Sequence, residues 1–385
     1  MKSRLREDLK ALMLIPGLSG HEERVASWLR ERLSALGLTH RTDRLGNLIA
    51  TLPGDPAKPS VMIFTHMDQL GFFVRKIEPD GLIRVERMGG VSERAMAAQE
   101  VTLCGTKGDL SGIIMNKAHH ATTPEEKYKV LTAPEIRIDT GHGSKAAVEA
   151  AGIRIGTPVV YAGRVIELAG DRIAGTSVDD RAGCAALLEL ARLRVRRGGA
   201  RAGLGQMAAG QAGPGQARPT IDGPTVHLVW SVQEEFNLRG AVVAAQNLAP
   251  DIAIQIDLML ATDTPDMADR GEMLMGGGPG ISLYSFHGRG TLNGVIPHPA
   301  LVSLLEDTAE ALSLPLQRSA QVGVLTDLSY VQLLGDGVAA IDVGFPMRHS
   351  HSAVECCDLA DLEGLVRLLD GALDRIPQAM KLERD

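Results

Sequence analysis

The chain has 385 residues and a formal net charge of −7 at pH 7, with 44% hydrophobic and 23% charged residues. That length exceeds the size of most single domains, so two domains with substantial cores are expected. The acidic balance and the scattered basic residues argue against nucleic acid and anionic membranes as partners. No apolar run reaches the roughly 18 residues of a membrane span. The N-terminus predicts an amphipathic helix rather than a signal peptide.

The first part of the chain predicts an α/β domain. Residues 3–37 predict helices on either side of the turn Pro16–Gly20. Strands are expected at 47–52 and 60–65, and the second is almost wholly apolar. A continuous apolar run of this length is typical of a strand buried on both faces of a sheet.

The pattern changes between residues 74 and 165 to short strand-like runs separated by turn signals. These runs are 82–86, 100–104, 112–115 and 158–161. They predict a small all-β domain inserted into the α/β domain. The larger domain then comprises residues 1–73 and 166–385, with a mixed sheet between layers of helices.

Residues 194–219 are rich in glycine, alanine and arginine and lack an apolar period, which predicts a flexible surface segment. A basic tail for nucleic acid is the less favoured interpretation. Two strands are expected after it, 226–231 just before a pair of glutamates and 252–256 just before Asp257. Ligands bind at the edge of an open α/β sheet where such strands end.

The most informative motif is the pair Asp179 and Asp180, which ends a loop just before an expected helix. Adjacent carboxylates repel each other, and a divalent cation is the simplest way to hold them together. Asp179 could instead cap a helix that begins near Arg181. Because capping needs only one carboxylate, the pair favours Asp179 as a bridge between two cations, with Asp180 as a cap or support.

His66 on its own would be interpreted as a structural histidine. Asp68 lies two residues later, and its carboxylate can accept the second imidazole N–H of a metal-bound histidine. This spacing favours His66 as a metal ligand and Asp68 as the residue that orients it.

Glu234 and Glu235 come shortly after the expected strand 226–231 and precede Gly240, where a helix is expected. Solvent-exposed charge at a strand end is the alternative. A buried strand before the pair favours a function, with one glutamate binding metal and the other accepting a proton from water.

One further carboxylate and one histidine are needed. Asp257 directly follows an expected strand, whereas Asp263 lies in a turn, so Asp257 is the better candidate ligand. Either His349 or His351 can complete the site. The remaining histidines, His287 among them, are interpreted as structural. Together these side chains form the ligand set of a two-metal hydrolase.

These motifs resemble those of the M42 family of metallo-aminopeptidases, which includes glutamyl, deblocking and tetrahedral aminopeptidases. The resemblance covers nearly the whole chain. Its motifs are Thr65–Phe72, Asp179–Gly183, Gln233–Glu235 with Arg239–Ala241, Asp257, Gly276–Pro279, Thr326–Asp327, and His351–Ser352 with Glu355.

The resemblance implies two divalent metal ions, Zn²⁺ or Co²⁺, in each subunit. Asp179 would bridge them, through a cis peptide bond to the next residue. Glu235 and His351 would complete one metal, and His66 and Asp257 the other. Histidine and carboxylate ligands suit either metal ion.

The resemblance also implies the reaction, which is hydrolysis of the N-terminal peptide bond of short peptides. Glu234 would be the general base on a water shared by the metals, and Asp68 would orient His66. The family usually has Arg-Tyr shortly before the ligand histidine, where this chain has Arg348 and His349.

The inserted domain corresponds to the dimerisation domain of the family. It contains Val101, Leu103, Ile113, Ile114, Val159 and Val160, more apolar residues than a small β layer is expected to bury alone. At least a homodimer is therefore expected, and the family resemblance extends this to a tetrahedral dodecamer.

Two other functions compete with the peptidase. One is a metal-dependent amidohydrolase or deacylase of small N-acyl compounds. The other is a non-catalytic metal-binding scaffold subunit, which would be expected to lack Glu234 or Asp179. The cysteines, with Cys356 and Cys357 adjacent, lack the spacing of metal or redox motifs, so reduced thiols and a cytoplasmic location are expected.

Overall fold

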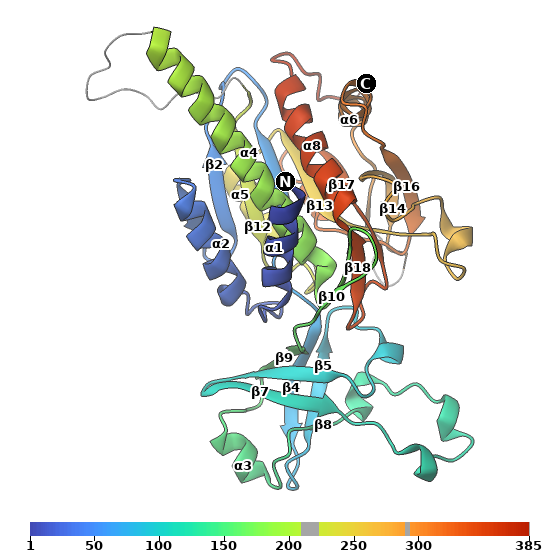
Figure 1. The fold of residues 1–385 in the computed structure, drawn as a ribbon. Helices are drawn as coiled ribbons and strands as arrows, with labels where there is room; N and C mark the ends of the chain where they lie inside the picture. The colour runs from blue at the N-terminus through green and yellow to red at the C-terminus, as the bar shows by residue number, and fades with distance from the viewer. Residues whose placement is uncertain (209–222, 289–292, 385) are drawn as a thin grey trace.

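The structure, a computed structural model, describes residues 1–208, 223–288 and 293–384. Within these residues a 12-stranded mixed sheet forms the core of the larger part, and a closed barrel of antiparallel strands forms the smaller part (Figure 1). The predicted α/β fold with a small all-β unit is confirmed.

The large sheet brings the ends of four parallel strands to one edge. Its main path is β1 (His40–Thr42), β2 (Leu48–Leu52), β12 (Val226–Ser231), β3 (Val61–His66), β13 (Ile252–Leu260), β17 (Ala339–Arg348), β18 (Glu355–Asp358), β11 (Arg172–Gly175) and β10 (Val165–Glu167). Strands β14 (Gly280–Phe286), β15 (Gly294–Val295) and β16 (Gln317–Val322) extend it from β17. Strands β12, β3, β13 and β17 run parallel to one another, so their carboxyl ends meet.

Helices cover both faces of this sheet because alternate side chains of its buried strands point to opposite faces. Val61 and Ile63 of β3 belong to the core on one face, and Met62 and Phe64 belong to the core on the other face. A different set of helices packs against each of these two cores. The first set is α1 (Lys2–Met13), α2 (Glu23–Ala35), α4 (Val178–Ala208), α6 (Pro299–Ala311) and α8 (Leu359–Arg375). The second set is α5 (Gly240–Leu248) and α7 (Leu328–Val331).

The barrel hangs below the carboxyl edge of the sheet (Figure 1). Its strands are, in order around the barrel, β4 (Gly71–Ile77), β5 (Ile83–Met88), β8 (Ile138–Asp139), β7 (Gly108–Ile114), β6 (Glu100–Gly105) and β9 (Pro158–Tyr161), and α3 (Lys145–Ala150) precedes β9. Of the six apolar residues that the sequence suggested were too many to bury, five are buried within the single chain, and Ile113 alone is exposed, at 57%. Closing the sheet into a barrel creates an interior that a flat β layer lacks.

Two elements are longer than the sequence predicts. Helix α4 continues through residue 208, so residues 194–208 are helical rather than irregular, and residues 209–219 lie outside the described residues. Arg194 and Arg197 in this extension form ion pairs with Asp370 and Asp374 of α8, which anchor its first turn. Strand β13 continues past Asp257 to Leu260 by pairing with β17.

None of the described helices has the length and apolar character that a bilayer crossing requires.

Candidate active site

The candidate site lies where β12, β3 and β13 have their carboxyl ends. His66 ends β3, and Ser231 at the end of β12 is its partner in the parallel register. The pairing of β13 with β3 stops at Gln255, and Asp257 lies two residues further along. A cleft of about 430 Å³ opens at this edge, lined by His66, Asp257 and both glutamates that follow β12.

Asp179 lies between the two predicted histidine ligands. Its Oδ1 is 3.1 Å from His66 Nε2, and its Oδ2 is 3.4 Å from His351 Nε2. The peptide bond that follows it is cis. The other nitrogen of each ring contacts a backbone carbonyl, His66 Nδ1 that of Asp68 at 3.2 Å and His351 Nδ1 that of Gly90 at 3.0 Å. Such contacts orient a metal-binding imidazole and leave its Nε2 free for a ligand bond.

Two groups of donor atoms in the described residues are compact enough to hold a metal ion. One comprises Asp179, Glu235 and His351, and the other His66, Asp180 and Asp257. Within each group the donor atoms lie within 4.8 Å of one another. Since Asp179 also contacts His66, its carboxylate faces both groups.

Asp180 is held by groups outside the cleft. One carboxylate oxygen accepts a hydrogen bond from the Thr65 hydroxyl, and the other accepts one from the Gly183 N–H at 3.1 Å. A Cβ at Gly183 would collide with this carboxylate. Asp179 and Asp180 have non-helical φ and ψ, so the regular part of α4 begins after them. The contact from the N–H of Gly183, three residues after Asp180, is that of a helix cap. Burial, with Asp257 as the next cause, raises the pKa of Asp180 well above its usual value.

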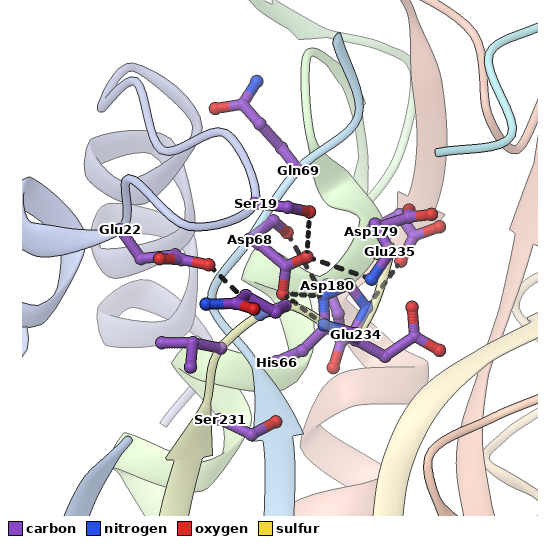
Figure 2. Close-up of polar contacts among 12 residues, drawn as sticks. Ser19, Glu22, His66, Asp68, Gln69, Asp179, Asp180, Ser231, Glu234 and Glu235 are labelled. Atoms are coloured by element: carbon purple, nitrogen blue, oxygen red, sulfur yellow. Dashed lines mark hydrogen bonds and ion pairs between the residues drawn. The ribbon is translucent and has the colours of Figure 1, made fainter. Parts of the chain in front are cut away.

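Asp68 organises the loop that carries the glutamate pair. Its carboxylate accepts hydrogen bonds from the N–H groups of Glu234 and Glu235, each at 3.0 Å, and from Ser19 Oγ at 2.5 Å (Figure 2). Its Oδ1 lies 3.5 Å from His66 Nδ1, which is farther than the backbone carbonyl of Asp68 itself. The carboxylate therefore fixes the backbone of both glutamates as well as facing the imidazole.

Sequence reasoning assigned no role to three residues that support the site. Glu22 accepts hydrogen bonds from the backbone of Gly20 and Gln233. Glu355 accepts from the N–H groups of Asp179, at 3.0 Å, and of His351, at 2.8 Å. Gly90 comes from the end of the β5 segment, in the barrel part of the chain. Glu355 belongs to a recognised motif, but no periodicity or spacing in the sequence indicates that Gly90 reaches the site.

The site contains more carboxylates than cationic groups. Burial raises the pKa of Glu235 to about 8 and that of Asp257 to about 7, and neighbouring carboxylates add to both shifts. Burial also raises the pKa of Glu234 well above its usual value. Although burial lowers the pKa of His66, the carboxylates of Asp179 and Asp68 outweigh it and leave that pKa raised. This oxygen and nitrogen donor set, with unbalanced negative charge, fits divalent cations.

Asp263 and His349, the alternatives considered from the sequence, lie in neither donor group of the described residues. Asp263 is bound instead by the guanidinium of Arg348, with contacts of 2.8 and 2.6 Å, and organises a loop. His287, which was interpreted as structural, lines the cleft. Its surrounding sequence carries no signal for that position.

Comparison with known proteins identifies the family. The family model described as M42 glutamyl aminopeptidase matches residues 46–198 and 215–368. The putative aminopeptidase SgcX of Escherichia coli (strain K12) is 37% identical over 370 residues, covering 96% of this chain and 93% of that protein. The solved aminopeptidase APDkam598 from the archaeon Desulfurococcus kamchatkensis has a TM-score of 0.85 at 31% identity, covering 98% of this chain and 96% of that one. The TET1 peptidase of Pyrococcus horikoshii, which can assemble into a tetrahedron or a large octahedral shell, has a TM-score of 0.80 at 26% identity, covering 96% of this chain and 99% of that one. The chain therefore belongs to the M42 family of aminopeptidases.

Proposed function

We propose that this protein is an aminopeptidase that uses two divalent metal ions to remove N-terminal residues from short peptides. The observation that carries the proposal is the position of Asp179, whose two carboxylate oxygens face His66 and His351 separately. A carboxylate with an imidazole nitrogen on each side is the arrangement that a bridging ligand requires.

Asp179 would be shared by both metals, with Glu235 and His351 on one and His66 and Asp257 on the other. Zn²⁺ and Co²⁺ both suit these nitrogen and oxygen donors. Asp180, whose carboxylate oxygens already contact Thr65 and Gly183, would support the site from behind. When bound, such metals lower the pKa of water and polarise the carbonyl of the bond to be cleaved.

Glu234 would act as general base. It lines the cleft but belongs to neither donor group of the described residues, so its carboxylate is available for proton transfer. It would take a proton from the attacking water and pass it to the nitrogen of the leaving amine when the peptide bond breaks. Asp68 fixes the backbone of Glu234, and burial raises the pKa of the Glu234 carboxyl. A raised pKa suits a group that must both accept and return a proton.

The protein would assemble at least into a dimer through the barrel, and in its larger form into a tetrahedral dodecamer. Such an assembly would allow only short peptides to reach the cleft. The exposed apolar residues Ile113, Met115, Tyr128 and Val130 in the stretch 113–130 of the barrel support this assembly.

The four cysteines are free, which supports the cytoplasm as the compartment.

The test uses the purified full-length protein, loaded with Zn²⁺ or Co²⁺, against aminoacyl-p-nitroanilides and N-acyl amino acids. We expect release of p-nitroaniline that a chelator abolishes and added metal restores. Cleavage of N-acyl amino acids alone would favour the deacylase, and no cleavage by a metal-loaded protein would favour the scaffold.

A further inference from the structure

A small cavity adjoins the cleft of the proposed active site. Its volume of about 20 Å³ holds roughly one water-sized group. The residues that line both it and the cleft are Asp257, Leu258, Leu260, Val324 and Thr326. The cavity, called the side chamber below, is therefore a recess of the cleft rather than a separate site.

Three polar atoms in the walls of the side chamber have no hydrogen-bond partner among the described residues. They are Asp342 Oδ2, Gln321 Oε1 and Ser285 Oγ. Their residues are only 4%, 6% and 4% exposed. Buried polar atoms are nearly always hydrogen-bonded, and two of these can only accept when Asp342 is ionised. The chamber is thus built for a guest that donates hydrogen bonds.

Asp342 also gives the side chamber a carboxylate without a counter-ion. Its second oxygen accepts a hydrogen bond from Thr326 Oγ1 at 2.9 Å, and none of the described basic side chains forms an ion pair with it. Burial, with a smaller contribution from Asp257, raises the pKa of Asp342 to about 7, although the Thr326 hydroxyl opposes the shift. A cation in the chamber would favour the ionised form.

The distance between the proposed metal ligands and Asp342 suits a long side chain. Asp342 is the register partner of Gln255, so it lies one strand across and two residues back from Asp257. Strand geometry makes this separation roughly 7 Å along the strand and roughly 5 Å across it. The four methylenes and amine of lysine reach roughly 6 Å. Leu258, Leu260 and Val324, which border both spaces, would pack against those methylenes.

We propose that the side chamber binds the side-chain ammonium group of a lysine at the first position of the substrate, and that Asp342 selects this residue. The inference rests on the aminopeptidase activity proposed above. An ammonium group supplies positive charge and three donors at the size of one water. The guanidinium of arginine is larger than the chamber, and the carboxylate of glutamate would be repelled by Asp342.

The test compares kcat/KM for lysyl-, norleucyl-, arginyl- and glutamyl-p-nitroanilide with the metal-loaded enzyme. Norleucine keeps the four side-chain carbons of lysine but lacks the amine. We expect kcat/KM for the lysyl substrate to exceed that for the norleucyl substrate by about tenfold or more, which is the effect expected of a hydrogen bond to a charged group. Asp342→Asn should remove this preference by lowering kcat/KM for the lysyl substrate alone.

Asp370→Asn is the matched control because Asp370 is an equally buried carboxylate that pairs with Arg194 and Arg197, away from the cleft. It should keep the preference for lysine. A wild-type enzyme that cleaves norleucyl as well as lysyl substrate overturns the inference, whether or not Asp342→Asn folds. An equal loss on all substrates in a folded Asp342→Asn also overturns it. Failure to cleave any aminoacyl substrate would instead remove the proposed function, and this inference with it.

Discussion

Glu234 and Glu235 are adjacent in the chain but have different surroundings. Glu235 shares a donor group with Asp179 and His351, whereas Glu234 lines the cleft outside both groups of the described residues. Glu234→Gln should therefore keep the bound metal and lose about 10²–10⁴-fold in kcat, because an amide cannot accept the proton of water. Glu235→Gln should instead lower the metal content of the purified protein.

Metal analysis by mass spectrometry, combined with kcat at saturating metal, separates these two effects. Glu272→Gln, at an exposed position, serves as the control and should match the wild type in both measurements. Metal loss in Glu234→Gln with full occupancy in Glu235→Gln would reverse the assignment within the pair.

Protons should leave the site when metal binds. Burial raises the pKa of Glu235 to about 8 and of Asp257 to about 7 without metal, so both carboxyls are largely or partly protonated at pH 7. Metal needs the ionised form, and the apparent affinity should rise between about pH 6 and pH 8. The metal-free fold should lose stability as pH rises from about 4 to 8, because the folded carboxyls then bind more protons than the unfolded ones.

Titration calorimetry of the metal-free protein at pH 7 checks this proton release, using two buffers of different ionisation enthalpy. The observed heat should differ between the buffers in proportion to the protons released. Equal heats in both buffers would show that the carboxyls are already ionised.

The sequence indicated which residues belong to the candidate site better than it indicated how they contact one another. The adjacent pair before an expected helix pointed to Asp179, and carboxylates after apolar strands pointed to Glu234 and Asp257, because strand ends are visible in the hydrophobic pattern. The hydrogen bonds from the Glu234 and Glu235 backbone to Asp68 were not predictable. They depend on the conformation of a loop, which the pattern of apolar residues does not specify.

At the scale of elements, the segment after β5 positions a proposed metal ligand that lies far away in the sequence. The carbonyl of Gly90 contacts His351 Nδ1, and a Cβ on Gly90 would lie 2.6 Å from that nitrogen. Gly90→Ala should therefore displace the imidazole and weaken metal binding by about 10–100-fold, as changes around metal ligands typically do. Gly143→Ala is the control, because its Cβ would meet no atom within 4 Å.

Competition with a fluorescent zinc chelator measures the affinity of both variants. Equal affinities in Gly90→Ala and Gly143→Ala would contradict this positioning role for the segment after β5.

The elements themselves were predictable where burial sets the pattern and less so elsewhere. Strand β3 is apolar along its length, and the sequence placed it within one residue of its observed bounds. Helix α4 was expected to stop before its glycine-rich part, since glycine disfavours a helix. Ion pairs of Arg194 and Arg197 with α8 are tertiary contacts that oppose this local preference, and single-sequence patterns do not contain them.

At the scale of the whole molecule, the proposed assembly would depend on the surface of the barrel. Ile113 and Tyr128 are 57% and 82% exposed, although most apolar residues of the barrel are buried in its own core. Met115 and Val130 of the same stretch, 113–130, are also exposed, and exposed apolar patches often mark protein interfaces. We therefore expect light scattering at micromolar concentration to give a mass of at least twice the 40.9 kDa of one chain.

Ile113→Lys should shift this assembly toward the monomer, because a charge buried in an apolar interface is costly. Leu333→Lys is the matched control, since Leu333 is also well exposed, at 66%, but follows α7 in the larger part of the molecule. It should keep the wild-type mass. If assembly restricts access to the cleft, the Ile113→Lys monomer should cleave long unfolded peptides faster than the wild type while cleaving aminoacyl-p-nitroanilides at a similar rate. A wild-type mass of one chain would refute the assembly, and the proposed chemistry, whose ligands all come from one chain, would be unaffected.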